Sequence, residues 1–181
     1  MGAKDTANTT TETIVLGGGC FWCLDASYKL VKGVTNVEEG YSGGDIPNPT
    51  DEQIYYENTG HAEVVRVTFD PNVISLDDIL EIFWTIHDPT TLNRQGYDVG
   101  PEYRSIIFYV NNSQKDSIEK SKQAAQKVWD DPIVTEVVPF KSFYPASAYH
   151  RDYEINRPDY CHLIINPKLK KLREKFAEKI A

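Results

Sequence analysis

The chain has 181 residues, of which 40% are hydrophobic and 25% are charged, so it is long enough for one domain built around a single apolar core. Its formal net charge of -8 argues against nucleic acid or an anionic membrane as a partner, because both repel an acidic surface. No apolar run is long enough to span a membrane, and an odd count of three cysteines argues against a secreted disulfide framework. We therefore expect a cytoplasmic protein with reduced cysteines.

The predicted elements begin after a polar N-terminal tail, residues 1–13, which lacks the apolar centre of a secretory signal. Residues 14–16 form a short apolar run that leads into three glycines, and a helical pattern follows over residues 21–32. Residues 34–41 predict a strand, residues 45–59 a turn-rich loop, and residues 62–69 a strand rich in β-branched side chains.

The second half of the chain repeats this alternation of helix and strand. Ser75 caps a helix with apolar residues at helical spacing, and a loop over residues 88–100 precedes a strand at 105–110. Residues 112–129 predict a helix, residues 133–138 a strand, and the segment from Pro167 onward a basic amphipathic helix. This order predicts an α+β fold with a ferredoxin-like split β-α-β-β-α-β core and extra C-terminal elements, all in a single domain over residues 14–181.

The strongest candidate site is Gly-Gly-Gly-Cys-Phe-Trp-Cys at residues 17–23. It places Cys20 after a strand and at the start of a helix, where unpaired backbone N–H groups and the helix dipole favour a thiolate. A glycine-rich turn beside a buried thiol would have the same local pattern. The adjoining Phe21 and Trp22 favour a functional site, because two large aromatic side chains beside a thiol form an apolar recess.

Cys20 and Cys23 also form a Cys-x-x-Cys pair, which suits a redox pair or half of a zinc site. A zinc site needs further ligands, and the adjacent Cys161 and His162 would not both point to one metal, so we expect no metal. Two other segments carry polar groups of interest. Glu63, in Gly-His-Ala-Glu, could serve as a general acid if it faced the thiol. The loop over residues 94–105 precedes a strand, and loops at strand ends commonly carry functional residues.

Taken together, four motifs identify a family that none of them identifies alone. They are Gly-Cys-Phe-Trp, the pieces Gly-Tyr-Ser-Gly-Gly and Asn-Pro-Thr, Gly-His-Ala-Glu, and Gln-Gly-x-Asp-x-Gly-x-x-Tyr-Arg-Ser, in this order along the chain. The chain strongly resembles the methionine sulfoxide reductase A family, the peptide-methionine (S)-S-oxide reductases, over roughly residues 14–165. The resemblance implies that residues 14–181 form a catalytic domain.

The resemblance implies a role for each matching residue. Cys20 would be the nucleophile, Phe21 and Trp22 would cradle the methyl group of the substrate, and Glu63 would protonate the sulfoxide oxygen. The catalytic set is thus Cys20, Glu63 and a resolving thiol, and Asp98 and Tyr103 would polarise or position the oxygen. Cys20 would become a sulfenic acid, condense with a second thiol, and be restored by a thioredoxin-like dithiol donor, with no metal or organic cofactor.

The resolving thiol has two candidates. Cys161 resembles the recycling position of some family members, and we favour it over Cys23, whose helix could hinder closure of a disulfide. Cys23 stands where glycine is more common in the family, and it is the alternative or additional resolving thiol.

A second departure concerns the residue after Asn-Pro-Thr. The family usually has a tyrosine there that helps to bind the sulfoxide oxygen, whereas this chain has Asp51. We expect Asp51 to weaken the site unless Tyr55 or Tyr56 supplies the lost hydroxyl.

Two rival functions remain. One is a peroxide-reactive thiol redox sensor, which would use the same thiol. The other is an inactive binder of oxidised methionine, which the departure at Asp51 would explain.

Overall fold

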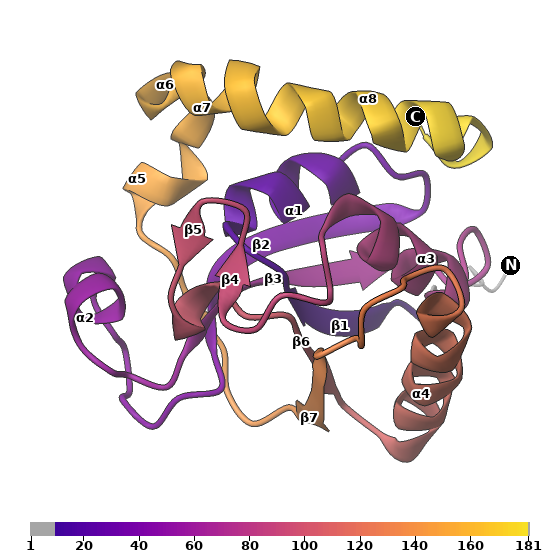
Figure 1. Cartoon of the computed structure of the whole chain (residues 1–181), viewed down its shortest axis with the longest axis horizontal. Helices are drawn as coiled ribbons and strands as arrows, with labels where there is room; N and C mark the ends of the chain where they lie inside the picture. The colour runs from indigo at the N-terminus through magenta and orange to yellow at the C-terminus, as the bar shows by residue number, and fades with distance from the viewer. Residues whose placement is uncertain (1–9, 181) are drawn as a thin grey trace, which may run out of the picture.

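The chain folds into a six-stranded sheet whose principal helices pack on one face, as Figure 1 shows for a computed structural model that describes residues 10–180. The strands are β1 (Glu12–Gly17), β2 (Val34–Ser42), β3 (Ala62–Phe69), β6 (Ile106–Tyr109), β7 (Glu136–Pro139) and β8 (Tyr144–Pro145), and β4 (Arg94–Gln95) with β5 (Asp98–Val99) makes a separate hairpin. The helices are α1 (Phe21–Tyr28), α2 (Asp51–Tyr56), α3 (Leu76–Ile86), α4 (Asn112–Gln126), α5 (Ala148–Arg151), α6 (Tyr153–Asn156), α7 (Pro158–Tyr160) and α8 (Asn166–Lys175). Short turns η1 (Pro101–Tyr103), η2 (Cys161–Ile165) and η3 (Ala177–Lys179) complete the described residues.

The sheet has the strand order β7-β6-β1-β3-β2-β8. Its four central strands pair antiparallel, and the edge strand β7 runs parallel to β6. Because β1 lies between β3 and β6, and β3 lies between β1 and β2, each connection through α1 or α3 spans one intervening strand. The fold is therefore a mixed α/β arrangement with helices stacked on a central sheet.

Burial on both faces explains why β1 and β3 are almost continuously apolar. Ile14 and Leu16 point into the core beneath the helices, whereas Val15 points to the opposite face, where Phe140 and Phe143 of the loop before β8 cover it. On the helical face, α8 crosses above α1 (Figure 1), and its Leu172 is fully buried. Cys20 thus lies at the end of a buried strand and beneath a layer of helices.

The structure corrects several predicted boundaries. β1 begins at Glu12, inside the predicted tail, because Glu12 pairs with Phe69 of β3; residues 1–9 of that tail lie outside the described part of the chain. Helix α1 ends at Tyr28 rather than residue 32, since Val31 bridges to Ile180 and Gly33 takes a positive φ of 89°. β7 begins at residue 136 rather than 133.

Two regions contain helices that the sequence did not indicate. Helix α2 lies within the predicted loop over residues 45–59, where Thr50 and Gln53 form a reciprocal capping box. Short helices and a π-helical turn fill residues 148–165, between β8 and α8. Both regions border the site described next.

Candidate active site

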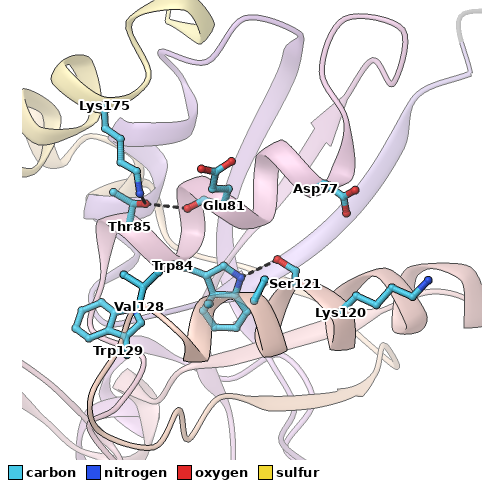
Figure 2. Close-up of a pocket in the computed structure, with 11 residues that line it drawn as sticks. Asp77, Glu81, Trp84, Thr85, Lys120, Ser121, Val128, Trp129 and Lys175 are labelled. Atoms are coloured by element: carbon cyan, nitrogen blue, oxygen red, sulfur yellow. Dashed lines mark hydrogen bonds between the residues drawn. The ribbon is translucent and has the colours of Figure 1, made fainter.

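Two cavities compete as functional sites. The first, about 420 Å³, lies between α3, α4 and α8 and is drawn in Figure 2. Four of its polar side chains pair with each other: the Trp84 indole N–H donates to Ser121 Oγ at 2.9 Å, and Lys175 Nζ donates to Thr85 Oγ1 at 3.0 Å. No cysteine or histidine lines it, and none of the residues that the sequence singled out for chemistry does.

The second cavity, about 370 Å³, lies at the N-terminal end of α1 and contains most of the residues that the sequence singled out. It is lined by Cys20, Phe21, Trp22, Tyr55, Glu63, Asp98, Tyr103, Tyr149, His150, Arg157 and Tyr160. These residues come from α1, α2, β3, the β4–β5 hairpin with η1, and the segment α5–α7. Segments distant in the sequence therefore meet around one thiol, as expected for a ligand-binding or active site.

The turn before α1 fixes the position of Cys20. Gly19 has a φ of 88°, and a side chain there would lie 2.6 Å from Gln95, so this close approach requires glycine. Cys20 is the N-cap residue of α1, with extended backbone, and its side chain caps no backbone N–H. The thiol is thereby free to face the cavity.

Glu63 lies on the helical face of β3, opposite Tyr41 of β2, and is only 2% exposed. The backbone N–H of Phe21 donates to Glu63 Oε1 at 3.4 Å, which ties the carboxyl to the start of α1 beside Cys20. Burial raises the pKa of Glu63 well above its ordinary value, and the nearby Asp98 and Glu102 raise it further. Burial thus favours the protonated carboxyl, which is the form that can donate a proton.

The Cys20 thiol does not have the lowered pKa that its place at a helix start led us to expect. Burial raises its pKa well above the ordinary value, the nearby Glu63 and Cys23 add to this, and the nearby backbone N–H of Trp22 opposes it. Removal from water here outweighs the helix dipole. Burial therefore favours the neutral forms of both Cys20 and Glu63.

An aromatic wall faces the thiol. Phe21 is fully buried, and Trp22 is 6% exposed and stacks on Tyr153 at a centroid distance of 5.6 Å. Trp22 also meets Tyr160 edge-on at 5.2 Å, which fixes the plane of the indole. The wall offers a rigid apolar surface large enough for a methyl group.

Polar groups from the loop before β6 also line the cavity. They are Asp98 and Tyr103, which the sequence named as substrate-binding residues. Burial raises the pKa of each, and the Glu63 charge would oppose ionisation of the Tyr103 phenol. Tyr103 thus presents a neutral hydroxyl close to the carboxyl and the thiol.

The two candidate resolving thiols lie outside this lining. Cys23 is 3% exposed, one turn after Cys20, and its Sγ lies 3.6 Å from the Tyr160 hydroxyl. Cys161 is partly buried and lines a separate cavity beside Ala26 of α1. The charge of Cys23 contributes to raising the pKa of Cys161, so these two thiols lie near each other. All three cysteines are free.

Asp51 lies outside the lining, whereas Tyr55, one helical turn later, is part of it. Tyr56 is 86% exposed and is also absent from the lining. Sequence reasoning named Tyr55 only as a substitute for a missing hydroxyl. It did not identify His150 or Tyr160 as site residues, because their place at the cavity depends on contacts with segments distant in the sequence.

Among residues 10–180, no group of three or more histidine, cysteine or acidic side chains is arranged to hold a metal ion. Within the same range, no helix is both long and apolar enough to cross a membrane.

Comparison with known proteins gives a consistent result. A family model described as peptide methionine sulfoxide reductase matches residues 12–180. The peptide methionine sulfoxide reductase MsrA of Saccharolobus solfataricus is 53% identical over 171 residues, which are 93% of this chain and 97% of that protein. The corresponding protein of Sulfolobus acidocaldarius is 51% identical over 170 residues, with the same shares covered.

Solved structures agree with the sequence comparison. Mxr1 from Saccharomyces cerevisiae in its reduced form superimposes with a TM-score of 0.78 at 34% identity, over 86% of this chain and 90% of that one. Mxr1 in complex with Trx2 superimposes with a TM-score of 0.59 at 27% identity, over 83% of this chain and 90% of that one.

Proposed function

The chain belongs to the peptide methionine sulfoxide reductase family, and we propose that it is the thiol-dependent enzyme that reduces methionine-S-sulfoxide, free or in proteins, to methionine. The observation that carries this is the cavity in which a single thiol, a neutral carboxylic acid and an aromatic wall face one another. A sulfoxide needs these three things: a nucleophile for sulfur, a proton for oxygen and an apolar place for the methyl group.

Cys20 is the proposed nucleophile and Glu63 the proposed acid. A sulfoxide oxygen is a poor leaving group until it is protonated, and Glu63 is buried, neutral and tied to the start of α1 next to the thiol. The Cys20 sulfur attacks the sulfoxide sulfur while the Glu63 proton passes to the oxygen, and the thiol proton of Cys20 passes to the Glu63 carboxylate and restores the acid. The hydroxyl then moves from the methionine sulfur to the Cys20 sulfur as the new S–S bond breaks. Methionine leaves with the two electrons that Cys20 has lost, and Cys20 ends as a sulfenic acid.

Phe21, Trp22, Asp98 and Tyr103 are the proposed substrate-binding residues. The aromatic wall would exclude water from the methyl group, and its fixed indole plane supports this role. Tyr103 carries a neutral hydroxyl that can donate a hydrogen bond to the oxygen, and Asp98 lines the same cavity. Together they would orient the sulfoxide with its sulfur towards Cys20.

Recycling requires a second thiol to displace water from the sulfenic acid. We propose that the disulfide finally forms with Cys161, which lies partly exposed, and that a thioredoxin-type dithiol reduces it, as the complex of Mxr1 with Trx2 supports. Cys23 is the alternative or intermediate partner. Side chains three positions apart on a helix have Cβ atoms about 5–6 Å apart, so Cys23 can reach Cys20 with a small shift, whereas Cys161 must leave its separate cavity.

We also propose a fold assignment and a cellular compartment. The strand order β6-β1-β3-β2, with α1 and α3 as crossovers, supports a ferredoxin-like split β-α-β-β-α-β core within a single catalytic domain, residues 14–181. Three free cysteines and a reaction that consumes thiols support a reducing compartment such as the cytoplasm.

A direct assay tests the function against its two rivals. The protein is incubated with dithiothreitol and either epimer of a blocked methionine sulfoxide, and methionine formation is followed. We expect reduction of the S epimer only. A protein that binds the sulfoxide without producing methionine would be an inactive binder. A protein that consumes hydrogen peroxide and neither binds nor reduces the sulfoxide would be a thiol sensor.

A further inference from the structure

The helix α2 presents Asp51 and Tyr55 on one face, because residues four apart lie one above the other on a helix. This face meets the segment that contains Ser147 and His150. Tyr55 is 40% exposed at the cavity mouth, and its ring meets the His150 ring edge-on at a centroid distance of 6.1 Å. Of these polar side chains, Tyr55 and His150 line the cavity and Asp51 does not.

Both oxygens of Asp51 already have partners. The Tyr41 hydroxyl donates to Oδ1 at 2.7 Å, and the Ser147 hydroxyl donates to Oδ2 at 2.7 Å. His150 Nε2 lies 3.5 Å from the same Oδ2. The carboxylate is therefore held by neighbouring side chains and does not line the cavity.

His150 is 4% exposed, and its two ring nitrogens have different surroundings. Nε2 lies 2.7 Å from the Tyr55 hydroxyl and beside Asp51, whereas Nδ1 is buried without a hydrogen-bond partner among the described residues. A proton on Nδ1 would leave a buried N–H unpaired, which is costly, and would deprive the Asp51 carboxylate of a donor. The neutral ring thus carries its proton on Nε2.

This tautomer decides what Tyr55 can do. With its proton on Nε2, His150 donates to the phenolic oxygen of Tyr55, so the Tyr55 proton is not used up on the histidine. Burial raises the pKa of Tyr55, and the Glu63 charge would raise it further, so the phenol keeps that proton. Tyr103 offers a second neutral phenol in the same cavity.

We propose that Tyr55 donates a hydrogen bond to the sulfoxide oxygen, and that Asp51 and His150 are positioning residues which make it a donor by fixing the histidine tautomer. Tyr55 thereby supplies, one helical turn later, the hydroxyl that Asp51 lacks. This proposal rests on the proposed function, since it names a residue that binds the substrate of that reaction.

The first test is the rate constant of the first turnover, measured as the burst of methionine in single-turnover experiments. Tyr55→Phe keeps the ring and removes the donor, and we expect a slowing of about a hundredfold, as for loss of one oxyanion donor. Tyr56→Phe, the neighbouring exposed tyrosine, is the matched control and should react like wild type. If Tyr55→Phe reacts within about twofold of an active wild type, the proposal is wrong. If wild type itself makes no methionine, the proposed function has failed instead.

The second test asks whether Asp51 acts through Tyr55. Asp51→Asn removes the charge that favours the proton on Nε2 and should slow the first turnover in the wild-type background. It should have little further effect in the Tyr55→Phe background. Equal slowing in both backgrounds would show that Asp51 acts by another route and overturn the positioning role.

The third test reads the tautomer directly. A long-range ¹H–¹⁵N correlation spectrum of the imidazole rings, with His150 assigned from a His150→Gln sample, should show His150 neutral and protonated at Nε2. A neutral ring protonated at Nδ1 would mean that Tyr55 donates to the histidine rather than to the substrate, and would overturn the proposal.

Discussion

Replacing Glu63 by glutamine tests the proposed acid with minimal structural change. A glutamine side chain has the same shape, and its Oε1 can still accept the hydrogen bond from the Phe21 N–H at 3.4 Å. Glu63 is only 2% exposed, so no bulk water occupies its position. The substitution therefore removes one property, the ability to donate a proton as a carboxylic acid.

The expected effect follows from the role of that proton. Loss of a positioned general acid costs about a hundredfold in rate or more, which corresponds to ~2.7 kcal/mol in activation free energy. Because burial raises the pKa of Glu63, the acid keeps its proton to a higher pH than an exposed glutamate, and its contribution is lost as pH rises through that raised pKa. Glu63→Gln should lack this decline and should instead recover partly as pH falls, when solvent can protonate the oxygen.

Rapid-quench measurement of the methionine burst, at several pH values and with the S epimer in excess, gives the rate constant of this step alone. Glu102→Gln is a matched control, because Glu102 lies near Glu63 electrostatically but outside the cavity lining. A Glu63→Gln burst as fast as that of wild type at neutral pH would remove Glu63 from the mechanism.

Three further predictions concern the thiols and a buried acid. Cys20→Ser should abolish reduction with any donor, because a neutral hydroxyl is a much weaker nucleophile; dithiothreitol-driven turnover would disprove the assignment. Cys161→Ser should keep the methionine burst but lose thioredoxin-driven turnover. If Cys161→Ser instead turns over normally with thioredoxin and Cys23→Ser does not, Cys23 is the resolving thiol. Burial and the nearby Asp25 raise the pKa of Glu39 from 4.5 to about 9, so unfolding releases its proton and stability falls as pH rises between those values. Glu39→Gln should therefore raise the thermal midpoint more at pH 8 than at pH 5, a result that calorimetry can check.

The central sheet was predictable because its signals are local. The β-branched run of β3 and the apolar run of β1 are buried on both faces, and α3 has both a capping box at Ser75 and a continuous apolar face. Their order along the chain indicated a fold in which helices and strands alternate around a central sheet. The motif that we propose as catalytic was equally local, since Cys20, Phe21 and Trp22 are consecutive.

The rest of the site depends on contacts between segments distant in the sequence. The hydrogen bond from Ser147 to Asp51 joins residues 96 positions apart, and the one between Tyr55 and His150 joins residues 95 apart. Helix α2 lies in a stretch whose prolines and asparagines indicate turns, so its single capping box was the only local signal for it. The direction of the Cys20 pKa shift was mispredicted because burial is a tertiary property that the helix start does not reveal.

The central claim, that Cys20 reduces the sulfoxide by becoming a sulfenic acid, has one direct measurement. The variant Cys23→Ser/Cys161→Ser leaves Cys20 as the sole thiol, because the chain has three cysteines. After reaction with methionine-S-sulfoxide and no reductant, methionine and dimedone-trapped Cys20 are quantified by mass spectrometry. We predict equal amounts of both, stoichiometric with the protein. Methionine formed without modification of Cys20, or trapped Cys20 formed without methionine, would contradict the account.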